Sequence, residues 1–329
     1  LASKELRMAL IKEELLEIKD KYGDARRSVI EYSGGDVSIE DLIADENVVI
    51  TISHAGYIKR TNLSEYKTQN RGGVGQKSAG TRDQDFLEHM YVATNHQYMM
   101  FFTQKGKCFW MRVYEIPEGS KTAKGRAIQN LINIESDDKV KAFICTQDLK
   151  DQDYIKSHNL VMVTKKGQVK KTSLEKYSKP RVNGVAGITI KDGDELMSAQ
   201  LTNGESQIIL AVKSGKLVRF EETKTRPMGR TASGVRGITL KDDTDEVIGM
   251  VTVDKNDIND TQVLVVTENG YGKRTKLVDE DGEDVYRITN RGGKGVKTLK
   301  KKEKTGKLIS ISAVTDADDL MIINKSGLT

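Results

Sequence analysis

The chain has 329 residues, of which 37% are hydrophobic, 31% charged and 5% aromatic. This length suffices for roughly two average domains and a sizeable core. With 29 glycines and only 3 prolines, the composition favours many tight turns and excludes a proline-rich disordered or collagen-like chain. No run approaches the ~18 apolar residues of a membrane-spanning helix, and the N-terminal residues do not resemble a signal peptide. We therefore expect a cytoplasmic protein with no membrane partner.

The distribution of charged residues along the chain is more informative than the net charge. The 53 Lys and Arg residues against 48 Asp and Glu residues give a formal net charge of +5, which alone is weak evidence for a polyanionic partner. No Lys or Arg lies between Arg27 and Lys59, and residues 29–47 are rich in Asp and Glu. We predict that residues 29–47 form an acidic linker.

The N-terminal segment, residues 1–28, is predicted to be helical. Apolar residues recur at spacings of 3, 4, 3 and 4 from Met8 to Tyr22, the seam of a coiled-coil-like helix over residues 4–22, and Gly23 ends it. Two interpretations remain open. The helix packs on its own domain, or the seam belongs to a longer arm of which this chain is a fragment.

Beyond the linker the sequence repeats itself. Six stretches share a short apolar run, a glycine turn and a basic or polar return, as in residues 208–220, and each is a β-hairpin signal. The turn glycines are Gly56, Gly106, Gly167, Gly215, Gly270 and Gly327. A second motif follows each of the first five hairpins, reading GGVG at 72–75, KGRA at 124–127, GVAG at 184–187, GVRG at 234–237 and GGKG at 292–295.

These repeats predict an all-β fold. About four short strands recur every 50 residues or so, a pattern that fits radial blades, because an isolated four-stranded sheet leaves its face and edges uncovered. We predict that residues 48–329 form a propeller-like disc of about six four-stranded blades, preceded by the short helix. A linear β-solenoid would need much shorter repeats.

Basic residues return at the same place in most copies, three or four residues after the turn glycine. Rotation of the blades would align them into a positive band on the rim that neutralises phosphates, with the glycine-rich loops adding backbone N–H donors. The alternative is that they only keep exposed strands soluble. These return cations are Lys59, Arg60, Lys170, Lys171, Arg219, Lys273 and Arg274, and the loops add Arg181, Arg230, Arg236, Arg291 and Lys294.

The residues near these cations indicate which kind of nucleic acid they would bind. Few aromatic residues interleave with them, so duplex backbone fits better than single strands. No helix is expected after residue 47 to enter a major groove, so binding should be nearly independent of sequence.

No catalytic or metal site is expected. Cys108 and Cys145 lie in apolar stretches with no CxxC and are predicted to be buried thiols. The four histidines are scattered, no HExxH or GxSxG motif occurs, and the glycine-rich runs lack P-loop spacing. We predict no catalytic residue, metal or cofactor in this fragment.

One loop carries a specific resemblance. Residues 69–75, Gln-Asn-Arg-Gly-Gly-Val-Gly, resemble the box of the bacterial DNA gyrase A family, whose usual form is Gln, basic, Arg, Gly, Gly, basic, Gly. Asn70 and Val74 replace the two variable basic residues. Residues 265–275 with 290–295 resemble the fifth blade of the family's C-terminal region, residues 229–240 the fourth, and residues 19–27 the end of the preceding DNA-cleavage domain.

The resemblance implies a six-bladed β-pinwheel whose blades exchange strands, with residues 1–28 as the end of the cleavage domain's coiled coil. The disc would bind, bend and wrap duplex DNA, so that ATP-dependent strand passage introduces negative supercoils. The holoenzyme, a type II topoisomerase with isomerase activity, would use ATP and Mg²⁺ and form a heterotetramer that contains gyrase B and a second A subunit. Its catalytic residues would lie outside this fragment. The box residues implied in DNA binding are Gln69, Arg71, Gly72, Gly73 and Gly75.

Two other functions stay open at this point. The C-terminal domain of the topoisomerase IV A subunit is related and has a degraded or missing box, which the replaced residues in 69–75 leave room for. A propeller that serves only as a protein-interaction scaffold is the second, and it predicts binding that survives high salt.

Overall fold

The computed structural model describes residues 3–25, 27–28, 39–65, 85–299 and 303–318. The chain divides into two compact units, Leu1–Ile43 and Ala44–Thr329, which are described separately. In the first unit, helix α1 (Lys4–Tyr22) ends as predicted, where the Gly23 N–H donates to the Lys19 carbonyl at 2.7 Å. No residue of α1 is buried, so its apolar seam is exposed. A 3-10 turn, η1 (Ile39–Leu42), follows.

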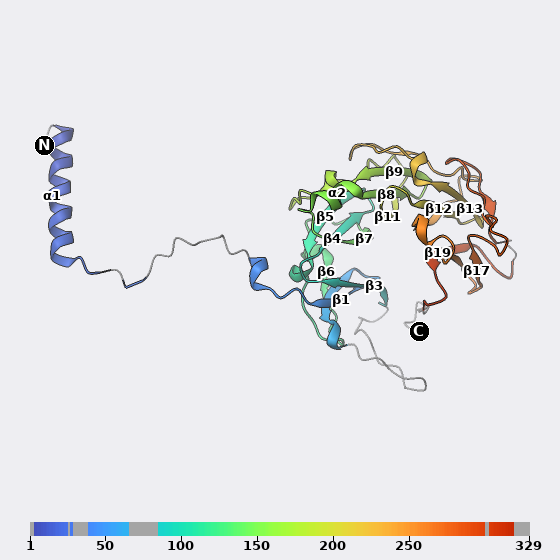
Figure 1. The fold of residues 1–329 in the computed structure, drawn as a ribbon, viewed down its shortest axis with the longest axis horizontal. Helices are drawn as coiled ribbons and strands as arrows, with labels where there is room; N and C mark the ends of the chain where they lie inside the picture. Colours follow the sequence, from blue (N-terminus) through green and yellow to red (C-terminus); the bar gives the residue numbers. More distant parts are fainter. Residues whose placement is uncertain (1–2, 26, 29–38, 66–84, 300–302, 319–329) are drawn as a thin grey trace. The chain divides into compact units, whose positions relative to one another are not determined.

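The second unit is built from five β-sheets that follow one another around an arc in chain order (Figure 1). In spatial order their strands are β3 (Leu87–Thr94), β1 (Asn47–Ser53), β2 (Tyr57–Asn62) and β6 (Arg126–Ala127); β10 (Val185–Ala186), β5 (Lys107–Arg112), β4 (Tyr98–Thr103) and β7 (Val140–Thr146); β11 (Leu196–Thr202), β8 (Asn159–Thr164), β9 (Gln168–Ser173) and β14 (Val235–Arg236); β15 (Val247–Val253), β12 (Gln207–Val212), β13 (Lys216–Glu221) and β18 (Val296–Lys297); and β17 (Gly272–Lys276), β16 (Gln262–Thr267) and β19 (Leu308–Val314). We call these sheets blades one to five.

The all-β propeller-like fold is confirmed, but the predicted number of about six blades is wrong. The residues that the structure describes form five blades, four with four strands and the fifth with three. The sixth hairpin, around Gly327, lies outside the described residues.

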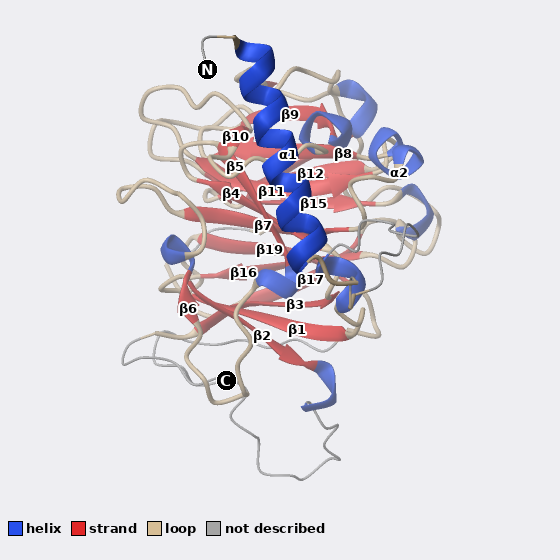
Figure 2. Ribbon diagram, turned by 90° about the vertical axis from the view of Figure 1, so that its left-hand side faces the viewer, coloured by secondary structure: helices blue, strands red, loops and turns tan. Residues whose placement is uncertain are grey.

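Helical segments in this unit are short and lie at the ends of strands (Figure 2). They are α2 (Gln152–Ser157) and the 3-10 turns η2 (Leu63–Glu65), η3 (Val113–Glu115), η4 (Ile128–Asn130), η5 (Leu174–Tyr177), η6 (Glu222–Lys224) and η7 (Lys255–Asp257). No helix among the described residues is both long and apolar enough to cross a membrane.

The predicted hairpins form at the predicted glycines. Gly56, Gly106, Gly167, Gly215 and Gly270 all have φ between 78° and 85°, the left-handed region that glycine enters without steric penalty. They close the hairpins β1–β2, β4–β5, β8–β9, β12–β13 and β16–β17.

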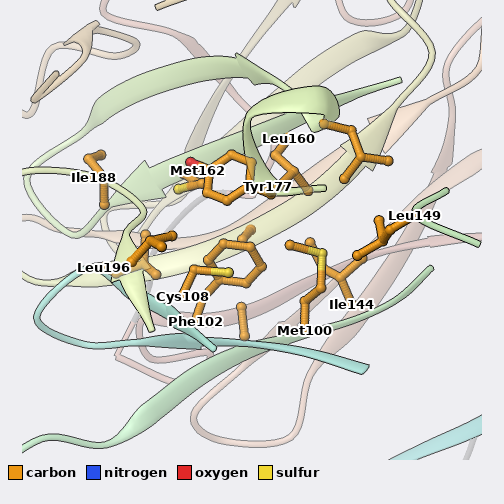
Figure 3. Packing of buried hydrophobic residues seen from close by; sticks show 14 of the residues in the cluster. Met100, Phe102, Cys108, Ile144, Leu149, Leu160, Met162, Tyr177, Ile188 and Leu196 are labelled. Atoms are coloured by element: carbon orange, nitrogen blue, oxygen red, sulfur yellow. The ribbon is translucent and has the colours of Figure 1, made fainter. Parts of the chain in front are cut away.

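The core lies between neighbouring blades. Every residue of β12 is buried, because blades pack against both faces of this sheet, as a continuous apolar run predicts for a fully covered strand. Between blades two and three, Met100, Phe102 and Cys108 face Leu160 and Met162 (Figure 3). The half-buried Trp110 packs against this cluster.

Blades are completed by strand exchange. The short outer strand of each of the first four blades comes from the chain that follows the next blade's hairpin. Thus β6 follows β5 in sequence but pairs with β2, and β14 follows β13 but pairs with β9. The predicted second motif contains β6, β10 and β14 in three of its copies and directly precedes β18 in the copy at 292–295, so in these four copies it takes part in blade assembly.

Candidate nucleic-acid interface

Four loops cross the outer side of the blades on their way to the exchanged strands. We call them the exchange loops: residues 117–125, 178–184, 225–234 and 286–295, which lead into β6, β10, β14 and β18. Three of them run beside the outer hairpin strand of the preceding blade through isolated parallel bridges, such as Lys171 with Pro227. Each of these three loops is therefore held at two places. One is the isolated bridge along the loop, and the other is the strand pairing at its end.

A glycine ends each exchange loop for a steric reason. Gly125, Gly184, Gly234 and Gly295 have φ between 66° and 87°. A Cβ added at any of them would lie between 2.5 and 2.8 Å from a carbonyl oxygen of the preceding blade. The glycines therefore allow the close approach of the exchanged strand. The Gly292 N–H, one of the predicted phosphate donors, already donates to the Gly237 carbonyl at 2.6 Å.

The prediction that the return cations form an exposed band is wrong for four of them. Lys170 is fully buried, and Lys59, Lys171 and Arg219 are 5% exposed or less. Sequence spacing placed these side chains on a strand surface, but the next blade's exchange loop covers that surface. Their aliphatic stems pack in the interior, and carbonyl or carboxylate oxygens bind the charged ends, as burial of a charge requires.

The oxygens that bind these buried cations belong mainly to the loops of the next blade. Lys59 Nζ donates to the carbonyls of Ser120 and Lys121 at 2.8 and 2.6 Å. Lys171 Nζ lies 3.6 Å from the Glu222 carboxylate. Each such contact ties a hairpin to a loop of the next blade.

Arg219 makes the most contacts of the four. Its Nη1 donates to the carbonyls of Leu277 and Tyr286 at 3.2 and 3.0 Å and pairs with Asp284 at 2.9 Å. Its Nε donates to Gln207 at 2.7 Å. Burial lowers the pKa of this guanidinium, and Asp284 opposes that effect.

The other three return cations differ from these. Arg60 is half-buried, donates to the Ile116 carbonyl at 2.9 Å and pairs with Glu118 at 3.0 Å. Lys273 and Arg274 in blade five are exposed, and Arg274 pairs with Asp316 at 3.0 Å. Along the part of the chain that the structure describes, no exchange loop covers β17.

The loop cations are where the structure leaves positive charge accessible. Arg181, Arg236, Arg291 and Lys294 are exposed and Arg230 is half-buried, and within the described ranges none of them forms an ion pair with a carboxylate. Arg291 is held by backbone oxygens, its Nε donating to the Lys224 carbonyl at 3.0 Å. Gln69, Arg71, Gly72, Gly73 and Gly75 of the box lie outside the described residues.

Sequence analysis missed further exposed cations of the same kind. Each of them lies in an exchange loop or in the exchanged strand that the loop leads into. They are Lys124, Arg126, Lys179, Arg287 and Lys297.

The last exchange loop borders a hollow of about 440 Å³. Arg287, Arg291 and Lys294 line it together with Gly292, Gly293 and Gly295. Three cations around one hollow that contains backbone amides of glycine suit a phosphate group. This loop also has nearly the sequence of the box, reading Asn-Arg-Gly-Gly-Lys-Gly at 290–295.

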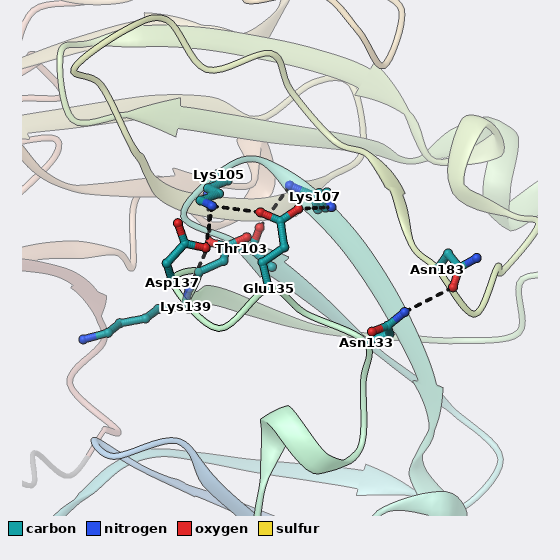
Figure 4. A network of polar contacts seen from close by, with 9 residues as sticks. Thr103, Lys105, Lys107, Asn133, Glu135, Asp137, Lys139 and Asn183 are labelled. Carbon is teal, nitrogen blue, oxygen red and sulfur yellow. Dashed lines mark hydrogen bonds and ion pairs between the residues drawn. The ribbon is translucent and has the colours of Figure 1, made fainter.

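Unlike the loop cations, two basic residues at a hairpin turn form ion pairs with carboxylates. Lys105 pairs with Glu135 and Asp137 at 2.8 and 2.6 Å, and Lys107 pairs with Glu135 at 2.7 Å (Figure 4). Hydrogen bonds from Lys105 and then Lys107 lower the pKa of Glu135 to about 2. These lysines are already neutralised, in contrast to the loop cations.

Within the described residues, no group of three or more His, Cys, Asp and Glu side chains is placed to hold a metal ion. Cys108 is buried and Cys145 half-buried, neither in a disulfide. The absence of catalytic residues from this fragment stays a prediction.

The comparisons with known proteins agree with the blades one by one. The sequence profile of the family described as DNA gyrase C-terminal domain, beta-propeller, matches residues 47–94, 97–147, 158–203, 207–254 and 261–315. The chain belongs to this DNA gyrase C-terminal domain family. Each matched segment contains the hairpin of one blade and the strand that pairs with the hairpin's first strand (β3, β7, β11, β15 or β19). The five matched segments therefore agree with the five blades of the described residues.

Relatives support the same family. The DNA gyrase A subunit of Staphylococcus aureus (strain NCTC 8325 / PS 47) is 41% identical over 329 residues, which cover 100% of this chain and 36% of that protein. The chain thus spans about a third of the length of the curated relatives it matches.

Two solved structures are also similar to this gyrase family chain. The C-terminal domain of DNA topoisomerase IV matches with a TM-score of 0.65 at 26% identity, covering 84% of this chain and 80% of that one. A DNA gyrase A C-terminal domain matches with a TM-score of 0.64 at 26% identity, covering 82% and 84%.

Proposed function

We propose that the five-bladed unit binds and bends duplex DNA along its exchange loops. The observation that carries the proposal is a row of accessible cations without carboxylate partners on successive exchange loops and on the strand β14. Arg181, Arg230, Arg236, Arg291 and Lys294 are among them. Contacts spread over several blades suit a bent duplex, because bending 20–30 base pairs through tens of degrees costs ~1–6 kcal/mol, which many phosphate contacts offset.

The composition of the loops favours a duplex over a single strand. Their only aromatic residue is Tyr286, which is 3% exposed and shares a hydrogen bond with Thr298 at 2.5 Å. Single strands bind through stacking on accessible aromatic side chains, which these loops lack. No helix of the described part of this unit exceeds the six residues of α2, so contacts to phosphates rather than bases should dominate.

In the whole protein, we place this unit as the DNA-wrapping part of a gyrase, an ATP-dependent type II topoisomerase with isomerase activity that works in the cytoplasm. Wrapping would present a crossover to the cleavage domain, and strand passage would introduce negative supercoils. ATP and Mg²⁺ would act in the holoenzyme, a heterotetramer of two A and two gyrase B subunits.

The experiment is energy transfer between the ends of a short labelled duplex over a salt series. Salt-sensitive approach of the ends is the expected result, and Arg291→Ala with Lys294→Ala should lower the salt slope by about 1.8, since each phosphate contact adds about 0.9. Lys156→Ala with Lys255→Ala removes the same charge from exposed sites outside the loops and should leave the slope unchanged.

Three outcomes would count against the proposal. Binding without approach of the ends would refute bending, and no binding at low salt would refute the DNA role. Partner binding that survives high salt would favour the protein-interaction scaffold. A supercoiling assay with the reconstituted holoenzyme separates the two assignments. Introduction of negative supercoils supports a gyrase, and its absence favours topoisomerase IV.

A further inference from the structure

Lys170 is a buried lysine with neutral binding partners. The side chain lies on β9 with no exposed surface, and no carboxylate of the described chain pairs with it. Its Nζ donates to the Gly187 and Arg230 carbonyls, each at 2.5 Å. Tyr177 donates its hydroxyl to the same Gly187 carbonyl at 2.9 Å. Burying an ammonium group without a counter-ion is unfavourable, so the contact calls for an explanation.

The two carbonyls come from different exchange segments. Gly187 directly follows β10, the strand that completes blade two. Arg230 lies in the loop 225–234, which leads from blade four into β14 and completes blade three. One ammonium group on blade three therefore joins the segments that link blades two, three and four.

The repeat shows that a blade does not need a lysine here. The position three residues after the turn glycine is Phe109 in blade two and Val218 in blade four, and both side chains are buried. An apolar side chain at this position is thus compatible with the hairpin. What Lys170 adds is the fixed link between the two exchange segments.

We propose that Lys170 is a positioning residue for DNA bending, which fixes the exchange loop 225–234 so that Arg230 presents its guanidinium at a set distance from the neighbouring loop. The inference rests on the proposed function. A side chain held by a supporting layer of contacts stays within the narrow geometry that a binding site requires. Bending in particular depends on the spacing between successive phosphate contacts.

The titratable groups around Lys170 do not provide a negative charge that would bind its ammonium group. Burial and then the nearby Arg230 charge lower the pKa of Lys170 to about 8. Tyr177, the other titratable group on the Gly187 carbonyl, has its pKa raised by burial. Cys108, also buried, has its pKa raised by burial and lowered in part by Arg230.

The test compares Lys170→Met, Arg230→Ala and the double variant in the end-to-end energy-transfer assay at low salt. Lys170→Met should bind the duplex with a Kd raised roughly threefold or more and bend it less at saturation, because Arg230 loses its fixed position. In the Arg230→Ala background the same change should have almost no further effect. Combined with Arg291→Ala, on the next loop, the effects should instead add.

Two variants separate positioning from folding. Lys170→Arg keeps donors for the two carbonyls and should retain most of the bending. Lys170→Val, which installs the residue of blade four, serves where Lys170→Met does not fold, as judged by circular dichroism. Normal bending by a folded Met or Val variant, or effects additive with Arg230→Ala, would overturn the inference. Failure of the unaltered chain to bend DNA would instead refute the proposed function.

Discussion

The glycine that ends an exchange loop offers the sharpest test of how the blades are joined. Gly234 has φ +87°, and a Cβ at this position would lie 2.6 Å from the Val169 carbonyl oxygen. Alanine would meet two penalties there. The left-handed backbone costs ~1–2 kcal/mol, and forcing a methyl group against a fixed carbonyl adds ~1–3 kcal/mol. We therefore expect Gly234→Ala to lower the free energy of unfolding by about 2–5 kcal/mol.

A matched control isolates the steric part. Gly56 has φ +81° but no atom within 4 Å of its added Cβ, so Gly56→Ala should cost only the ~1–2 kcal/mol of the backbone conformation. Urea unfolding followed by circular dichroism measures both, and hydrogen exchange at Val235 and Arg236 reports whether β14 detaches. Equal losses in the two variants, with β14 equally protected, would show that close approach of the exchanged strand does not require the glycine.

Three further predictions concern buried or half-buried groups. Arg219→Met leaves Asp284 and two carbonyls without their donor, and should lower the free energy of unfolding by about 2–5 kcal/mol in urea; an unchanged midpoint would contradict the assigned network. Lys170 has a folded pKa of about 8 against an ordinary 10.5, so the unfolded chain binds more protons between these values. The unaltered protein should therefore gain about 3 kcal/mol relative to Lys170→Met as pH rises through that window, and a constant difference would rule the shift out. Burial raises the pKa of Cys145 to about 11 and that of Cys108 well above its ordinary value, so neither thiol should react with a thiol reagent at pH 8 before denaturation; rapid labelling of the folded chain would show otherwise.

Local rules predicted the hairpins. A glycine between two short apolar or polar runs fixes a turn through its own φ, so Gly167 and Gly215 could be assigned without knowledge of distant residues. The end of α1 at Gly23 was also predicted from a local signal, although Gly23 has an extended conformation with φ −69°. Such features depend on a few neighbouring residues and can therefore be predicted from the sequence.

The fate of the return cations could not be predicted in this way. Lys59 and Lys170 have the same spacing from a turn glycine as the exposed Lys273, and only the crossing of the next blade's loop makes the difference. That crossing joins residues far apart in sequence, such as Lys59 and Ser120. Arg287 was missed for the related reason that it follows no motif but lies on the loop that borders the hollow.

Strand exchange also sets an order for folding during synthesis. The edge at Val169 on β9 receives its partner Val235 only after the whole next hairpin has been made. Each of the first four blades must therefore leave the ribosome with one unpaired edge, a state prone to pairing with other chains. Folding then proceeds one blade behind translation, and a chain cut at any blade boundary would expose the edge of the blade before it.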